Sequence, residues 1–102
     1  MEAVRTYGDI HGLSEENYER IRPSIPFDQV KYADRGLHVD YEGHYIDIEA
    51  FLDEVVRLMD EDGWGKVDFI DHVEWKMTRY ILRPGEYDTH HIRVDNVLDA
   101  MD

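Results

Sequence analysis

The chain has 102 residues, which suits one domain, since a chain of this size buries about 60–70% of its unfolded surface. An apolar fraction of 42% excludes a disordered tail, and the absence of cysteine excludes disulfides and zinc–thiolate sites. No apolar run approaches the roughly 18 residues of a membrane span, and the first residues do not resemble a secretory signal. We therefore expect a single cytoplasmic domain over residues 1–102.

Acidic residues dominate the charge. Aspartate and glutamate number 24 against 11 lysines and arginines, which gives a formal net charge of −13. Eight of the acids and a single base, Arg57, lie between Glu42 and Asp62. Such a surface repels nucleic acid and anionic lipid and attracts basic proteins and cations. The alternative is a surface that serves solubility alone.

The first element predicted along the chain is a short helix. Ser14 is a favourable N-cap, with Glu15 and Glu16 in the first turn. Pro23 should stop this helix, because proline cannot continue one.

Strand-like alternation follows the first helix. Leu37, Val39 and Tyr41 alternate with polar residues. We predict a three-stranded meander over residues 28–33, 37–41 and 44–47. A short helix after Pro26 is the alternative for its first strand. The turns would be a three-residue loop at 34–36, with Gly36 in the left-handed conformation, and a tight turn at 42–43.

The strongest helical pattern comes next. Apolar residues recur at helical spacing, which predicts a long amphipathic helix packed on the sheet: Ile48, Phe51, Leu52, Val55 and Met59. We expect Asp47 to cap this helix and Gly63 to end it.

The last third of the chain alternates like a strand from residue 66 to 81, with a bend or bulge near Asp71. Pro84 and Gly85 predict a turn into a partner strand, and Asp95 would cap a short final helix. The predicted fold class is therefore α+β: a short N-terminal helix, an antiparallel meander, a long amphipathic helix on the sheet, a C-terminal hairpin and a short helix.

Two stretches resemble each other, residues 41–56 and 87–102. Five identities relate them at a spacing of 46 positions, among them Tyr41/Tyr87 and His44/His90. A strand leading into a capped helix is a common signature. We interpret the likeness as one packing solution used twice in preference to a duplicated site.

Three carboxylates, Asp60, Glu61 and Asp62, stand at the predicted helix end, where the helix dipole repels them. Such a cluster suggests a compensating cation. The stretch "DEDGWGKVDFID" resembles an EF-hand calcium loop, with Gly65 at the tight turn and Val67 at the apolar position. Trp64 departs from that pattern, because it stands at a ligand position. The metal ligands implied by the resemblance are Asp60, Asp62, Asp68 and Asp71. Apart from calcium at this loop, we expect no cofactor.

Six histidines allow other chemistry. His38, Asp40 and Glu42 share one strand parity, as do His72 and Glu74, so a histidine–carboxylate site is an alternative. No phosphate loop or nucleophile motif is present. A small enzyme that uses Asp, Glu and His for acid–base chemistry is therefore a further alternative, and no catalytic residue is named.

We expect a non-enzymatic binding protein that presents carboxylates to a basic protein, in a regulatory or inhibitory role. Imitation of nucleic-acid phosphates is one specific version. A second copy of the chain is a further candidate partner, whereas direct nucleic-acid or membrane binding is not expected. The predicted partner-binding residues are Glu42, Glu49, Asp53, Glu54, Asp60, Glu61, Asp62 and Trp64, with Trp64 as an aromatic anchor.

Overall fold

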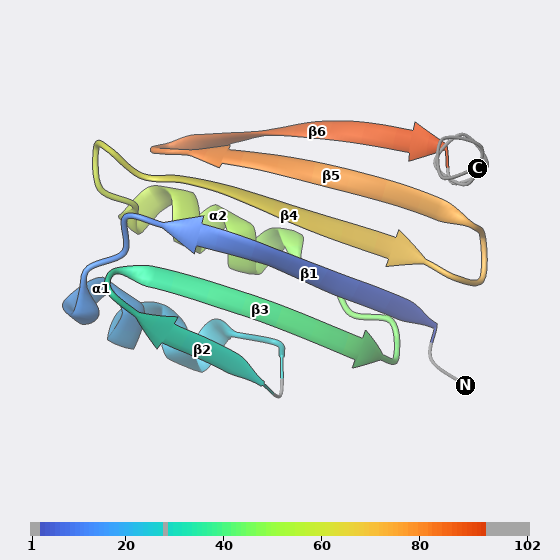
Figure 1. Ribbon diagram of the computed structural model, residues 1–102, viewed down its shortest axis with the longest axis horizontal. Helices are drawn as coiled ribbons and strands as arrows, with labels where there is room; N and C mark the ends of the chain where they lie inside the picture. Colours follow the sequence, from blue (N-terminus) through green and yellow to red (C-terminus); the bar gives the residue numbers. More distant parts are fainter. Residues whose placement is uncertain (1–2, 28, 94–102) are drawn as a thin grey trace.

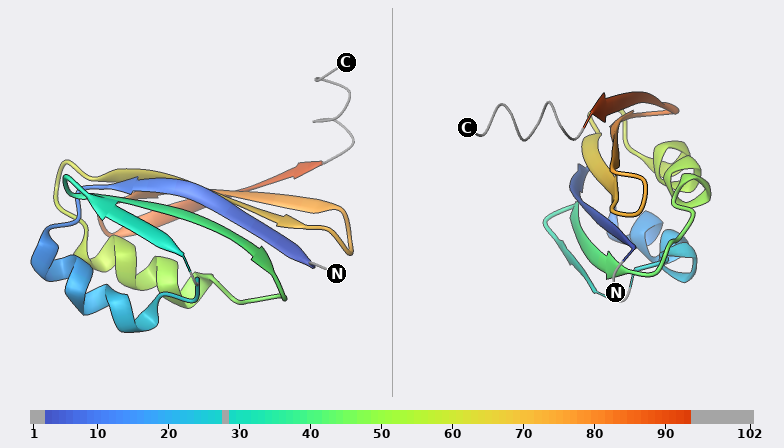
Figure 2. Two further views of the ribbon diagram at one scale, coloured as in Figure 1. Left: turned by 60° about the horizontal axis from the view of Figure 1, so that its bottom comes forward. Right: turned by 90° about the vertical axis from the view of Figure 1, so that its right-hand side faces the viewer.

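One antiparallel sheet forms the body of the protein, and its helices lie on one face (Figures 1 and 2). The computed structural model describes residues 3–27 and 29–93. In chain order the elements are β1 (Val4–His11), α1 (Glu15–Ile21), the 3₁₀ helix η1 (Arg22–Ser24), β2 (Val30–Ala33), β3 (Gly36–Gly43), α2 (Glu49–Leu58), β4 (Trp64–Asp71), β5 (Lys76–Arg83) and β6 (Glu86–Arg93). No helix in these residues is long and apolar enough to cross a membrane.

The strand order is β2-β3-β1-β4-β5-β6, and every neighbouring pair is antiparallel. The elements from β1 to β4 form two split βαβ units. The first unit is β1-α1-β2, whose two strands are separated by β3. The second is β3-α2-β4, whose two strands are separated by β1. The β5–β6 hairpin then extends the sheet beyond β4. This topology makes the first strand of the chain a central strand of the sheet.

The sequence of β1 suits a strand that is covered on one face. Val4, Thr6, Gly8 and Ile10 are buried and face the helices, while the alternate side chains face away. Gly8 is required by the close approach of β4, since a Cβ at this position would lie 2.1 Å from the carbonyl oxygen of Lys66. The core lies between this face and the helices, and its largest fully buried side chains include Phe51, Leu52, Ile10, Leu37, Leu82, Leu13 and Ile21.

The predicted fold class is wrong in its main emphasis, although the protein remains α+β-like. The structure is mostly antiparallel sheet with two short helices, instead of a long amphipathic helix packed on a meander. The amphipathic helix spans only Glu49–Leu58, because Met59 is already extended. Gly63 therefore does not end it. Asp47 accepts a hydrogen bond from the Glu49 N–H at 3.0 Å, but the N-cap position belongs to Ile48.

The predicted meander is also incorrect at its third strand. Residues 44–47 form no strand, because β3 runs through the expected turn to Gly43 and pairs with β1. The preceding turn has two residues and not three, since Ala33 pairs directly with Gly36. Asp34 and Arg35 take the positive φ angles of 51° and 63°, which is the pattern of a type I′ hairpin turn.

The long alternating stretch is two strands, not one bent strand. β4 ends at Asp71, and the turn over residues 72–75 leads into β5. Asp71 Oδ1 stabilises this turn by accepting hydrogen bonds from the N–H groups of Val73 and Glu74, at 2.9 and 3.1 Å. The short helix and its Ser14 cap are confirmed, as is the Pro84–Gly85 turn. The final helix predicted after Asp95 lies outside the described residues.

The two similar stretches take different structures where they are described. Tyr41 lies near the end of β3 and His44 in the loop after it, whereas Tyr87 and His90 both lie within β6. The likeness therefore marks no duplicated site in this part of the chain. Both tyrosines face the helical side of the sheet, which is a packing role.

Candidate functional site

The solvent side of α1, η1, α2 and the loop 59–63 forms what we call the acidic helical surface. The apolar residues of α2 face the sheet, so its charged residues face solvent. Three arginines lie on this surface, Arg20, Arg22 and Arg57. Nine carboxylates outnumber them: Glu15, Glu16, Glu19, Glu49, Asp53, Glu54, Asp60, Glu61 and Asp62. The excess of negative charge is therefore concentrated on the helical side of the molecule.

The structure brings together six of the eight residues predicted to bind a partner. Glu49, Asp53, Glu54, Asp60, Glu61 and Asp62 all belong to the acidic helical surface. Glu42 does not, because the alternation of β3 places it on the opposite face of the sheet. Trp64 also lies on that opposite face, where its ring stacks on His11 with ring centroids 4.4 Å apart.

The cation that compensates the carboxylates after α2 is Arg35. Its position in the β2–β3 turn directs the guanidinium to Asp60, which accepts a hydrogen bond from it, and to Asp62 at 3.4 Å. The hydrogen bond with Asp60 is the main reason that the pKa of Arg35 is raised. A structural ion pair thus explains part of the acidic cluster. Arg57 similarly donates to Glu54 at 2.9 Å.

Other carboxylates of this surface contact tyrosines instead of cations. The Tyr80 hydroxyl donates to Glu49 Oε2 at 3.3 Å. Burial, followed by the negative charge of Glu49, raises the pKa of Tyr80. Within the described residues, neither Asp53 nor Glu61 forms an ion pair. Asp53 instead lies beside Tyr87, whose pKa is raised by burial and then by the negative charge of Asp53.

The predicted calcium ligands do not meet. Asp60 and Asp62 lie before β4 and Asp71 at its far end, and eight extended residues separate them by about 25 Å. Asp68 is buried and accepts two hydrogen bonds from Arg79, at 2.8 and 3.2 Å. Among residues 3–27 and 29–93, no three metal-ligating side chains form a group.

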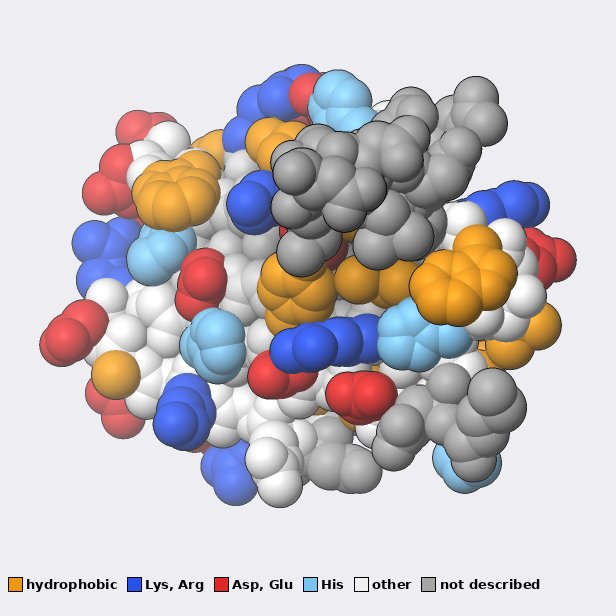
Figure 3. Space-filling model, turned by 45° about the vertical axis from the view of Figure 1, so that its right-hand side comes forward, with side chains coloured by type: hydrophobic (Ala, Val, Ile, Leu, Met, Phe, Trp, Pro, Cys, Tyr) orange, Lys and Arg blue, Asp and Glu red, His pale blue; other side chains and the backbone are white. Residues whose placement is uncertain are grey.

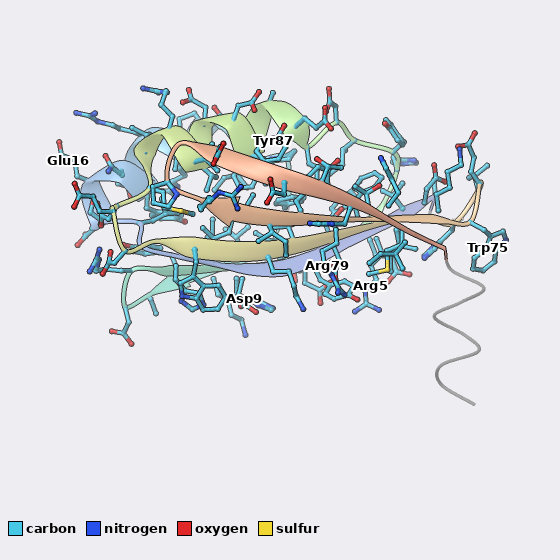
Figure 4. The ribbon with its side chains drawn as sticks, turned by 90° about the horizontal axis from the view of Figure 1, so that it is seen from above. Arg5, Asp9, Glu16, Trp75, Arg79 and Tyr87 are labelled. Carbon is cyan, nitrogen blue, oxygen red and sulfur yellow. The ribbon has the colours of Figure 1, made fainter. Side chains whose placement is uncertain are left out.

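The face of the sheet away from the helices, the open face, has a different character. By strand alternation and register it carries six carboxylates (Asp9, Asp40, Glu42, Asp68, Glu86 and Asp88) and five cations (Arg5, Lys31, Lys66, Arg79 and Arg83). Figure 3 shows acidic, basic, histidine and hydrophobic side chains interleaved there. In Figure 4, Arg5, Asp9 and Arg79 project away from the helices, while Tyr87 lies on their side. The charges of the open face are therefore nearly balanced.

A shallow hollow of about 220 Å³ lies on the open face near Asp9, His11, Lys31 and His38. His38 Nδ1 is 2.8 Å from Asp9 Oδ1, and both side chains are more than half exposed. A histidine beside a carboxylate can transfer protons. However, the residues that line this hollow include no hydroxyl or thiol nucleophile. Sequence analysis missed this pair, because the partner of His38 comes from the unpredicted strand β1 and not from Asp40 or Glu42.

Comparison of the chain with protein-family models, curated proteins and solved structures finds no match.

Proposed function

We propose that this protein binds a basic protein partner through the acidic helical surface, as a regulator or inhibitor in the cytoplasm. The observation that carries the proposal is the asymmetry of charge between the two faces. The acidic helical surface carries nine carboxylates and three arginines, with Arg35 of the β2–β3 turn as a fourth cation beside Asp60 and Asp62, whereas the open face is close to neutral. A role in solubility alone would not require the charge to be concentrated on one side.

The rigidity of the surface supports a specific interaction. The Asn17 side chain of α1 donates to the Leu58 carbonyl of α2 at 2.9 Å, which joins the two helices. Arg35 and its two aspartates hold the loop after α2. Carboxylates in fixed positions lose less conformational entropy on binding than mobile ones. In the most specific form of this proposal, the partner has a basic cleft that binds nucleic acid. The carboxylates of the acidic helical surface would then occupy the positions of the phosphates.

The structure changes the residues assigned to this surface. Glu42 and Trp64 lie on the open face and are left out, and Glu15, Glu16 and Glu19 of α1 are added. Asp53 and Glu61 are the most informative positions to alter, because they form no ion pair within the described residues. Changing them breaks no ion pair in this part of the chain, and Asp53→Asn keeps an oxygen that can accept a hydrogen bond from Tyr87.

The test is affinity capture from source-cell lysate with two matched baits, Asp53→Asn/Glu61→Gln and Asp40→Asn/Glu42→Gln. Both variants lose two negative charges, the first on the helical surface and the second on the open face. A captured protein is then purified, and its affinity for each bait is measured by calorimetry over a series of salt concentrations. Exposed charge pairs contribute about 0.2–1 kcal/mol each, so the helical variant, which loses two charges, should bind about 2–30-fold more weakly.

The expected result is a basic protein that is retained by wild type and by the open-face variant, and that is released at moderate salt. If both variants lose the same affinity, only the net charge matters and the helical surface has no special role. A partner lost only by the open-face variant would move the binding site to the other side of the sheet. Recovery of no basic partner with either bait would contradict the proposal.

A further inference from the structure

Among the described residues no strand pairs with the outer edge of β6, which is long enough to bind a further strand. β6 has eight residues and is the last strand of the sheet among the described residues, at the top of Figure 1. Asp88, Thr89, His90 and His91 are all exposed. Figure 4 looks down on this edge. An edge strand presents a row of N–H and C=O groups that a further strand can bind.

The turn before β6 determines which backbone groups face outward. Arg83 pairs with Glu86 across the two-residue Pro84–Gly85 turn, so this is the hydrogen-bonded pair nearest the turn. Residues of even number in β6 therefore direct their N–H and C=O groups toward β5. The groups of Tyr87, Thr89 and His91 point away from the sheet and are available to a new strand.

The side chains of β6 complement a second copy of the same strand. In an antiparallel pair related by a twofold axis at Thr89, Asp88 of each copy lies opposite His90 of the other. Tyr87 then lies opposite His91, and the two Thr89 residues face each other. An imidazole N–H can donate a hydrogen bond to a carboxylate, and the Asp88 carboxylate has further acceptor sites for this beside the one that accepts from Arg83 at 2.9 Å. Thr–Thr pairs also stabilise neighbouring strands, whereas like charges directly opposite destabilise them.

Neighbouring registers lack this complementarity. A twofold axis at Asp88 pairs Glu86 with His90 but places the two Asp88 carboxylates opposite each other at its centre. An axis at His90 places the two histidines opposite each other. Of the three arrangements, the axis at Thr89 alone pairs Asp88 with His90 twice. In all three arrangements the odd-numbered residues are the hydrogen-bonded positions, so the side chains and not the backbone favour the axis at Thr89.

We propose that two copies of this chain associate through β6, antiparallel and centred on Thr89, to form one continuous sheet. The contact is independent of a basic partner, because Asp88 and His90 lie on the open face and not on the acidic helical surface. It is a small contact, so the association is weak. Each copy carries a net charge of −13, and the carboxylates of α2 lie over β5 and β6. Salt screens this repulsion, so moderate salt should strengthen the dimer while it weakens binding to a basic protein.

Sedimentation velocity measures the dimer over a concentration series up to about 1 mM, which detects a contact with a millimolar Kd. Thr89→Pro removes one outward N–H and should weaken association at least about tenfold, since proline cannot donate to a strand ladder. Thr89→Val keeps the N–H and should stay within about threefold of wild type. Far-UV circular dichroism confirms that both variants fold.

Charge reversal provides a second, independent test. His90→Asp places a carboxylate opposite Asp88 of the other copy and should weaken association about tenfold, as should Asp88→His by placing histidines together. The double variant Asp88→His/His90→Asp restores the reciprocal pairing and should recover most of the affinity. Amide hydrogen exchange should slow with protein concentration at Tyr87, Thr89 and His91, but not at Asp88 or His90.

Three results would overturn the proposal. The chain could remain monomeric up to the highest concentration, or it could form a dimer that is insensitive to Thr89→Pro. The double variant could also fail to recover affinity lost by its two single variants. Loss of the dimer leaves the proposed partner binding intact, because the acidic helical surface includes no residue of β6.

Discussion

Replacing Arg79 with methionine tests the contribution of the buried ion pair on the open face. Asp68 is 2% exposed, and its carboxylate accepts two hydrogen bonds from the Arg79 guanidinium, at 2.8 and 3.2 Å. The hydrogen bond to Asp68 is also the main cause of the raised pKa of Arg79. Methionine keeps the length of the side chain but leaves the carboxylate buried without its cation.

The size of the effect follows from the exposure of the two partners. Removing one member of a buried pair costs about 3–5 kcal/mol. The Arg79 side chain is 36% exposed, so water can approach the site and the loss should be about 2–3 kcal/mol. For a domain of this size that corresponds to a fall in Tm of about 10–20 °C. Asp68→Asn removes the buried charge, and the double variant should lose about 1–2 kcal/mol less than the sum of the two single losses.

Urea unfolding followed by far-UV circular dichroism measures the free energy of unfolding for all four proteins, with the slope against urea as a check on two-state behaviour. The control is Arg83→Met, which breaks the exposed pairs of Arg83 with Glu86 and Asp88 and should change stability by less than about 1 kcal/mol. A loss below about 0.5 kcal/mol for Arg79→Met, or strictly additive losses in the double variant, would refute the reasoning.

Three further predictions concern local structure. Ser14→Ala removes the N-cap of α1 and should cost about 1 kcal/mol in urea unfolding, whereas Ser14→Thr should be nearly neutral. Gly8→Ala should destabilise the fold by more than 2 kcal/mol (roughly the cost of overpacking), since its Cβ would overlap the Lys66 carbonyl; a near-neutral variant would contradict the β1–β4 register. The raised pKa of Tyr80 means that the unfolded chain ionises this tyrosine first. The contribution of Tyr80 to the free energy of unfolding is therefore fully present below about pH 10 and is lost as the pH rises above that value. Tyr80→Phe should reduce the fall in the free energy of unfolding at alkaline pH.

Local signals predicted the elements that depend on neighbouring residues. Ser14 caps α1, and Pro84 with Gly85 joins β5 to β6, because capping and turn formation are decided within a few residues. The strand β1 was missed for a physical reason. Thr6 and Gly8 occupy half of its inner row, so the row does not have the apolar pattern of a core strand. The reason for glycine at position 8 is the close approach of the β4 backbone, which the sequence alone does not reveal.

Charge pairing was the least predictable part of the candidate site. Six of the nine acids of the helical surface were identified from composition and helix pattern, but Arg35 reaches Asp60 across 25 positions in the chain. The contact between Asp9 and His38 spans 29 positions. Both pairs depend on how β1 and the β2–β3 hairpin are placed, and residue spacing carries no information about that placement.

The central position of β1 has a consequence for synthesis. β1 leaves the ribosome first, yet β3 and β4, its two neighbours, end at Gly43 and Asp71. At about 5–20 residues per second, the roughly 60 residues after His11 take about 3–12 s to appear. For that time the strand at the middle of the sheet has no complete set of partners. The ribosome must therefore synthesise α2 and β4 before β1 can be paired on both of its edges.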